Sequence, residues 1–356
     1  MGSAIKQFFQ DFGATRIIIL GFFLFLCVAA VFLPGLNIAE LLTDSLQRIG
    51  MWGVLVLAML PAIVCGIGPN FGISVGILCG LVGGLFSLEF AWRVGDFMQL
   101  GAAQIFMLAI LFSLPFALFV GYGYGWLLNK VKGSEMVIAT YVGFSMVSIM
   151  KLAWIFLPLN NPEMAWPIGQ GVRVQISLFN RGIAGILDNF WAFSIGGVTI
   201  PTGLLLFFGI SCFLVWLFMR SKTGIAMYAT GDNPRFSEAA GINVDRHRII
   251  GTALSTALGA VGILVYAQSY GFLQLYEAPM FMPFIAVAAV LIGGASIKKA
   301  TIFNVIFGSV LFLAIYVVAM PVANAFTADL QNMGEISRRI IQNGVILYAL
   351  TQVGGE

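Results

Sequence analysis

The chain has 356 residues, of which 60% are hydrophobic and 9% are charged, and its formal net charge is +3. A soluble domain carries about 25% charged residues. This composition therefore excludes a soluble globular enzyme, and apolar runs from end to end exclude a soluble domain with a single anchor. The sequence predicts an all-α integral membrane protein whose helical bundle forms a single domain over residues 1–356. So small a net charge gives no support for nucleic-acid binding.

Apolar runs mark the candidate spans, because a bilayer core requires about 20 mostly apolar residues per helix. They lie near residues 17–33, 50–66, 73–90, 104–128, 136–157, 200–219, 249–269, 284–297, 302–319 and 338–352. These runs predict about ten transmembrane segments. The second, eighth and tenth are short enough to be partial or packed wholly within the protein. No small-residue cleavage site closes the first run, so we expect it to be retained as a span.

A break is predicted between the second and third runs, at the sequence GIGPNFG over residues 66–72. Pro69 lacks a backbone donor, and the glycines around it loosen a helix. A broken helix at membrane depth is tolerated only where it is buried in protein or lines a water-filled cavity. Asn70, Phe71 and Ser74 are therefore candidates for lining a solute path, and Gln268, near the end of the seventh run, is a further candidate.

Glycines recur at every fourth position from Gly68 to Gly84. Such a stripe lets helix backbones approach closely. We expect ordinary helix packing for its later part, from Gly76 onward.

The distribution of Lys and Arg predicts the orientation, since short cytoplasmic loops carry an excess of both. With the N-terminus inside, most of the 18 Lys and Arg residues fall in cytoplasmic segments, at positions 6, 16, 130, 132, 220, 222, 235, 246, 248, 298 and 299. Arg338 and Arg339 oppose this arrangement, because they open the last run on the outer side. The same topology leaves a long external segment, residues 160–199, in which we expect short helices lying on the membrane surface.

The cytoplasmic loop over residues 231–248, GDNPRFSEAAGINVDRHR, concentrates charge in an otherwise apolar chain. Asn233 is suited to cap a helix, Pro234 suits its first position, and Gly241 suits the left-handed residue that closes it. The pattern predicts a helix of about two turns, 234–240, which is too short to be stable in water alone. It carries Arg235, Phe236 and Glu238. The double capping and the apolar Phe236 favour docking to a cytoplasmic partner over a plain solvated loop.

This loop resembles the cytoplasmic loop of bacterial ABC importer permeases, in the branch that serves ribose, other simple sugars and nucleosides. Gly231, Asn233 and the run of residues 241–244, Gly-Ile-Asn-Val, match that branch in register, whereas Phe236 and Ser237 replace two small residues. Two further stretches are similar to the family: FIAVAAVLIGGASI at 284–297 and FGISVG at 71–76, where Gly72 replaces an acidic residue.

The resemblance implies that 234–240 is a coupling helix, with Asn233, Pro234, Arg235, Phe236, Glu238 and Gly241 as its coupling residues. It also implies a separate ATP-binding subunit, a second permease, an external substrate-binding protein and a location in the bacterial inner membrane. The chain itself would be no enzyme and need no cofactor, because ATP would be bound by the partner. It would move a small polar solute, a simple sugar or nucleoside, inward by alternating access.

The residue types in the chain also bear on other functions, namely ATP binding, metal binding and ion-coupled transport. No Gly-rich loop followed by Lys-Ser/Thr occurs, and His247 is the only histidine, so neither a Walker site nor a metal site is expected. The alternative function is a self-sufficient, ion-coupled secondary transporter with broken helices. That class needs ionisable residues inside the bundle, and the runs hold almost none.

Overall fold

The computed structural model describes residues 14–33, 35–95, 99–166, 171–276, 278–326, 340 and 343–344. The described part of the chain is mostly helical, with little sheet. Seven of its helices are long and apolar enough to cross a membrane. The sequence-based count of about ten spans is not confirmed: the first and eighth runs form shorter apolar helices, and most of 338–352 lies outside the described residues.

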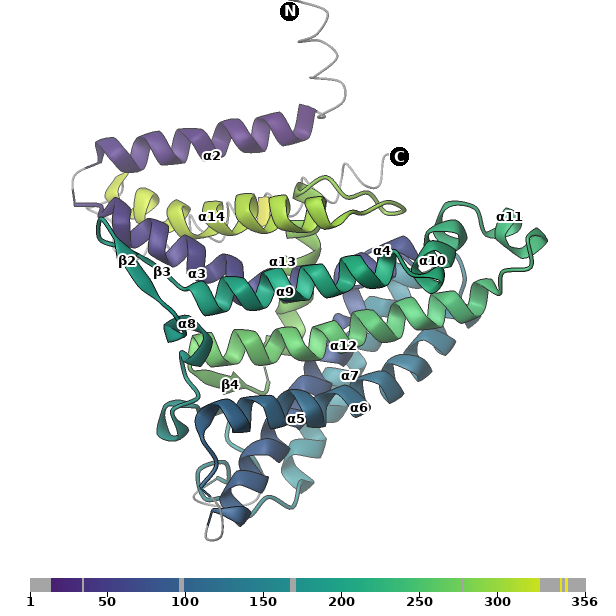
Figure 1. The fold of residues 1–356 in the computed structure, drawn as a ribbon, viewed down its shortest axis with the longest axis horizontal. Helices are drawn as coiled ribbons and strands as arrows, with labels where there is room; N and C mark the ends of the chain where they lie inside the picture. Colours follow the sequence, from purple (N-terminus) through teal and green to yellow (C-terminus); the bar gives the residue numbers. More distant parts are fainter. Residues whose placement is uncertain are drawn as a thin grey trace, which may run out of the picture.

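The helices that correspond to the apolar runs follow them in order, and α3 and the six-residue α4 share one run. They are α2 (Ala14–Phe32), α3 (Ile38–Leu57), α4 (Met59–Val64), α5 (Ser74–Val94), α6 (Ala102–Lys130), α7 (Glu135–Phe156), α9 (Thr202–Met219), α12 (Val244–Tyr270), α13 (Ala278–Ile292) and α14 (Ile302–Phe326). Two short helices, α10 (Lys222–Asp232) and α11 (Pro234–Ala239), lie between α9 and α12. In Figure 1, α11 projects from one end of the bundle, while the small strands lie at the opposite end.

The second span starts earlier than its apolar run. The run at 50–66 predicted a short segment, but α3 begins at Ile38 and continues through α4 to Val64, 27 residues in all, and 89% of its spanning window is buried. Hydropathy alone missed the first half because it carries charged residues such as Asp44 and Arg48. Of the two expectations for this short run, a partial span is wrong, whereas packing within the protein agrees with the structure.

The predicted break after this span is confirmed. Helix α4 ends at Val64, a single turn of 3₁₀ helix, η1 (Phe71–Ile73), follows, and α5 begins at Ser74. Gly66 and Gly68 have φ values of +83° and +92°, in the left-handed region that favours glycine. The break is buried, since Asn70 is fully inaccessible to solvent.

The glycine stripe serves helix packing only where it lies on α5. A Cβ added at Gly76 would lie 2.3 Å from the Thr256 carbonyl oxygen, and one at Gly80 would lie 2.4 Å from that of Ala260. Since no side chain fits there, α5 and α12 pack backbone to backbone. Gly68 lies in the break, outside any helix, so the stripe does not extend along one helix as far as the sequence pattern does.

The segment at 160–199, which the charge distribution predicts to be external, differs from the expectation of surface helices alone. It forms a strand β1 (Gln175–Ser177), a 3₁₀ turn η2 (Phe179–Arg181), a four-residue helix α8 (Ile186–Asn189) and an antiparallel pair β2 (Phe193–Ile195) and β3 (Val198–Ile200). Strand β1 pairs with β4 (Phe272–Gln274), which follows α12, with Ile176 opposite Leu273. This pairing attaches the segment to the end of α12, a long-range contact that local sequence does not indicate.

Candidate functional site

The helix predicted in the charged loop is present as α11. The Asn233 side-chain oxygen accepts a hydrogen bond from the Phe236 amide at 3.0 Å, and Pro234 occupies the first helical position. The helix ends at Ala239, one residue earlier than expected. Gly241 follows with φ +79°, as its role in helix termination requires.

The end of α11 is closed by two backbone hydrogen bonds. The Ile242 amide donates to the Ser237 carbonyl at 2.9 Å, and the Gly241 amide donates to the Glu238 carbonyl at 3.0 Å. This pair of bonds is the Schellman arrangement, which satisfies carbonyls that a helix end leaves open. Two turns of helix are thus fixed at both ends without a long apolar face.

The coupling residues named from the sequence lie on the outer surface of this helix. Arg235, Phe236 and Glu238 are exposed, and the Phe236 ring is 69% exposed. Neither Arg235 nor Glu238 forms an ion pair with any residue that the structure describes. A short rigid helix therefore presents one aromatic ring flanked by unneutralised charges, a composition suited to protein docking.

The base of the loop contacts the break between α4 and α5. A Cβ added at Gly231 would lie 2.1 Å from the Val64 carbonyl oxygen, and one at Gly66 would lie 3.0 Å from the Gly231 Cα. Only glycine allows two backbones to come this close. The loop and the broken helix are thus in direct backbone contact.

Ion pairs join the same loop to its neighbours. Asp232 pairs with Lys299 at 3.2 Å, in the loop before α14, and Asp245 pairs with Lys132 at 2.6 Å, in the loop between α6 and α7. The structure thus brings together three loops that the charge pattern assigned to one side of the membrane. These pairs are exposed and weak, since surface pairs contribute about 0–1 kcal/mol.

A third ion pair is buried. Arg248, in the first turns of α12, pairs with Glu135, the first residue of α7, and the two side chains are 8% and 12% exposed. The sequence assigned Arg248 to the cytoplasmic charge excess and did not identify this partner, which is more than a hundred residues away. The pair connects α12, the helix that follows α11 in the chain, to α7.

The candidate path residues at the break are held within the protein. The Asn70 amide donates to the Ser255 hydroxyl at 2.9 Å, and its oxygen accepts from the Tyr124 hydroxyl at 2.8 Å and the Gly72 amide at 3.1 Å. The Ser74 hydroxyl donates to the Pro279 carbonyl. Phe71 is half-buried against Phe284. These contacts position the break, and a role in lining the path stays a prediction.

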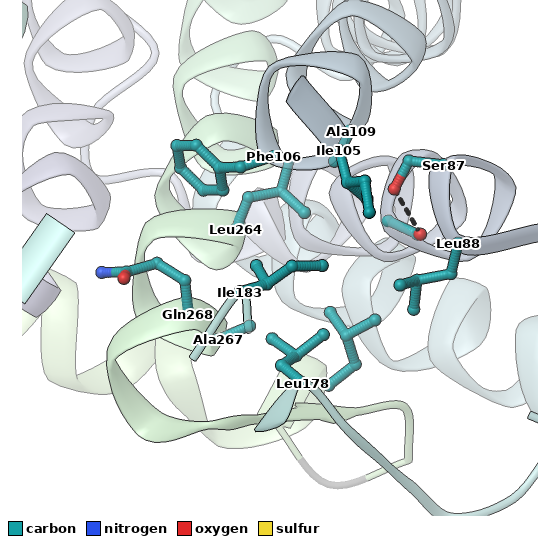
Figure 2. A pocket seen from close by; sticks show the side chains of 12 residues that line it. Ser87, Leu88, Ile105, Phe106, Ala109, Leu178, Ile183, Leu264, Ala267 and Gln268 are labelled. Atoms are coloured by element: carbon teal, nitrogen blue, oxygen red, sulfur yellow. Dashed lines mark hydrogen bonds between the residues drawn. The ribbon is translucent and has the colours of Figure 1, made fainter. Parts of the chain in front are cut away.

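Gln268 is likewise occupied by the protein. Its oxygen accepts from the Leu187 amide at 3.1 Å, and its nitrogen donates to the Val265 carbonyl at 3.2 Å. It borders a largely apolar cavity of about 20 Å³, and Figure 2 shows its amide group pointing away from the other lining side chains. A cavity of this size holds about one water molecule, so the sugar- or nucleoside-sized solute expected from the sequence does not fit there.

A polar surface that the sequence reading missed lies on α7. Only 17% of its spanning window is buried, and one exposed face carries Tyr141, Ser145 and Ser148, spaced by three or four residues. Lys151 lies near the same face, half-exposed and without an ion pair among the described residues. The exposed surface of α7 also carries hydrophobic side chains, at Val137, Ile149, Leu152, Ile155 and Phe156, so its hydroxyl groups are interspersed with apolar groups. The spacing of Tyr141, Ser145 and Ser148 by three or four residues, which places them on one face of a helix, was the signal in the sequence that could have identified this surface.

The chain was compared with known proteins. A sequence profile described as the permease component of the branched-chain amino acid transport system matches residues 67–350. Similar curated proteins include the nucleoside ABC transporter permease protein NupB of Lactococcus lactis, 23% identical over 269 residues, which cover 75% of this chain and 70% of NupB. The autoinducer 2 import system permease protein LsrC of Escherichia coli is 23% identical over 264 residues, covering 72% of this chain and 65% of LsrC.

No solved structure matched the chain. The profile nevertheless covers most of the break, helix α11 and all the described helices from α5 onward. The relatives named above are themselves permease proteins of transport systems. This multi-pass membrane protein belongs to the family of permease components typified by the branched-chain amino acid transport system.

Proposed function

We propose that this chain is the permease subunit of a bacterial ABC importer in the inner membrane, with its N-terminus inside, and that it moves a small polar solute inward. The solute is a simple sugar or a nucleoside. The observation that carries the proposal is the doubly capped helix α11, which presents Phe236 to solvent and rests through Gly231 on the buried break.

The energy for transport comes from a separate ATP-binding subunit, and the chain needs no cofactor of its own. Helix α11 docks into that subunit, and an external binding protein delivers the solute to the opposite end. Motion of α11 reaches the bundle by two routes: the backbone contact between Gly231 and Val64, and the buried pair of Arg248 and Glu135. Alternating access follows when these routes move α4 and α7.

The solute path runs along the exposed face of α7, opposite a second permease. Polar side chains in a membrane span usually face other protein or a water-filled cavity, and Tyr141, Ser145 and Ser148 form such a face. A copy of this chain or a related permease on the other side would enclose a passage lined by hydroxyl groups. Hydroxyl groups suit a neutral solute that both donates and accepts hydrogen bonds.

The test is ATP hydrolysis by the purified complex, reconstituted with its binding protein and carrying Phe236→Asp or Phe236→Leu. The Asp variant should abolish solute-stimulated hydrolysis, because it places a carboxylate in an apolar docking cleft, while the Leu variant should keep most of it. Gel filtration and membrane insertion should be unchanged in both. Full stimulation in the Asp variant would refute the coupling role. Uptake by the chain alone, driven by an ion gradient in liposomes, would favour a secondary transporter instead.

A further inference from the structure

A cavity of about 470 Å³ lies between α5, α6 and the segment that follows α7. Most of its lining is apolar and consists of a Leu-Pro-Leu segment at 157–159 and four aromatic rings, Phe86, Phe90, Phe112 and Phe116. The two remaining residues, Glu89 and Arg93, form an ion pair on α5. Since Phe90 and Phe116 are 41% and 42% exposed, the cavity opens on the surface of the helical bundle.

Glu89 fixes the position of Arg93 at the rim of this cavity. The Glu89 side chain is buried, and its carboxylate accepts a hydrogen bond from the Arg93 Nε at 2.8 Å. It also accepts the backbone amides of Asn160 at 3.2 Å and Asn161 at 3.0 Å, so its negative charge is shared among three donors. The Arg93 side chain is 54% exposed, and this pair uses only its Nε. The guanidinium is therefore held in place while its terminal N–H groups can donate to a ligand.

The depth of the cavity follows from residues that mark the membrane–water interfaces. Trp92, which is 38% exposed, precedes Arg93, and at the other end of α6 the Lys130 ammonium lies 5.4 Å from the centre of the Trp126 ring. Trp residues and basic side chains at the ends of spans are typical of headgroup level. Phe86 lies about 10 Å along α5 from Arg93, and half of a hydrocarbon core is about 15 Å thick. The cavity thus extends from headgroup level into one leaflet.

We infer that this cavity binds a phospholipid of that leaflet, with its phosphate on Arg93 and part of one acyl chain against the phenylalanine rings. An Arg guanidinium matches a phosphate because it can donate two parallel hydrogen bonds. The rings pair across the two helices, Phe86 with Phe116 at 5.9 Å and Phe90 with Phe112 at 6.0 Å between ring centres, so the apolar wall includes both α5 and α6. The leaflet is the outer one on the proposed topology, and the inference depends on no other part of the proposed function.

The lining does not suit the transported solute. A sugar or nucleoside requires several hydrogen-bonding partners, whereas the lining side chains other than Glu89 and Arg93 are all apolar. Helix α6 continues beyond the cavity to Phe119, one turn after Phe116, and Phe119 is 81% exposed. A bilayer covers such a surface without cost, because acyl chains are as apolar as the side chains that they contact. The combination of an apolar wall with one guanidinium at its rim matches an amphiphile.

The experiment is titration of dioleoyl-phosphatidylglycerol into the delipidated full chain in detergent, followed by native mass spectrometry. The quantity compared is the Kd of the first lipid bound. The variants are Arg93→Met and Phe90→Ala, with Arg93→Lys as the conservative replacement. The matched control is Arg220→Met, which removes an exposed Arg at the end of α9 that lies 4.0 Å from the centre of the Trp216 ring and does not line the cavity.

The Kd should rise roughly tenfold or more in Arg93→Met, because the charge-assisted hydrogen bonds to phosphate are lost. It should rise roughly threefold or more in Phe90→Ala, because less apolar surface is buried. Arg93→Lys should recover most of the affinity, and Arg220→Met should bind like the wild-type protein. An unchanged Kd in Arg93→Met or in Phe90→Ala overturns the site, and so does a wild-type protein that binds no lipid.

Two further measurements test other occupants. Glycerophosphoglycerol, the same headgroup without acyl chains, should bind roughly a hundredfold more weakly or not at all; equal affinity would assign the cavity to a free phosphate compound. Phe116→Cys, in a chain whose four native cysteines are replaced by Ala, tests for cover by a second permease. A disulfide between two such chains overturns the lipid assignment, and its absence under oxidation supports it. None of these measurements requires the ATPase, so their failure is distinct from failure of the Phe236→Asp test.

Discussion

Replacing Arg248 by Met should loosen the start of α12, which the buried pair with Glu135 attaches to α7 and which also covers Cys65 at the end of α4. Arg248 and Glu135 are 8% and 12% exposed, and removal of one partner from a buried pair costs about 3–5 kcal/mol, because the other charge is left unpaired. We expect the lower end of this range of free energy, since the Glu135 carboxylate still accepts a hydrogen bond from the Gly133 amide at 2.8 Å. A loss of about 3 kcal/mol multiplies the population of the opened state roughly a hundredfold.

Cys65 provides the assay. Its sulfur lies 3.9 Å from the Arg248 carbonyl oxygen and is fully buried beneath the start of α12, so it reacts only when that contact opens. In a chain whose other three cysteines, Cys27, Cys79 and Cys212, are replaced by Ala, the rate of maleimide labelling reports the opening equilibrium. Arg248→Met should raise this rate roughly a hundredfold, on the scale of tenfold per about 1.4 kcal/mol.

The control removes the exposed pair nearby. Lys132 and Asp245 are 47% and 57% exposed, so Lys132→Met should cost at most about 1 kcal/mol and raise labelling about fivefold or less. The double variant Glu135→Met with Arg248→Met should label more slowly than either single variant, because no charge is left unpaired. Equal rates for Arg248→Met and Lys132→Met would refute the argument that the buried pair holds α12.

Further predictions concern glycines and caps. Gly80→Ala places a methyl group 2.3 Å from the Ile263 side chain and should destabilise the bundle by about 1–3 kcal/mol. Gly123→Ala is the control, because a methyl group there meets nothing within 4 Å and should leave stability unchanged or raise it. Gel filtration after heating compares how much of each variant remains monodisperse. Asn233→Ala removes the α11 cap, worth about 1 kcal/mol, and should weaken ATPase binding by about fivefold, with Asn233→Asp as the conservative control. Gly241→Ala should weaken ATPase binding by a similar factor, because a residue with a Cβ pays about 1–2 kcal/mol at φ +79°. Surface plasmon resonance measures the affinity of each variant for the ATPase. Wild-type affinity in the Gly241→Ala variant would contradict the role of this turn.

Local signals allowed much of the fold to be predicted. Nine of the apolar runs correspond to helices, because burial in lipid or protein requires continuous hydrophobicity. The break at Gly66–Gly72 and the helix α11 were also predictable, since capping residues, Pro and Gly fix backbone geometry over a few positions. The first half of α3 was missed because charged residues such as Asp44 and Arg48 interrupt its hydrophobicity.

The site was less predictable. The sequence identified Phe236 and its capping residues correctly as a short exposed helix, but it could not place Arg248 opposite Glu135 or Gln47 beside Asp188. Those contacts join residues far apart in the chain, and their geometry depends on how the helices pack. The polar face of α7 was missed for a different reason: hydroxyl side chains hardly lower the hydropathy of a span, so composition hides them.

Helix α12 has a mechanical consequence because it joins both ends of the molecule. Its 27 residues make a rod about 40 Å long, at about 1.5 Å per residue. Asn243 begins it beside α11, and near its other end Ser269 bonds to Asp188 at 2.7 Å. A tilt of about 5° around a midpoint near Gly259 would shift each end of such a rod by about 2 Å, enough to break that bond. A helix of this length can therefore act as a lever: a displacement at the α11 end changes the hydrogen bond between Ser269 and Asp188 at the other end, without any chain of intermediate contacts.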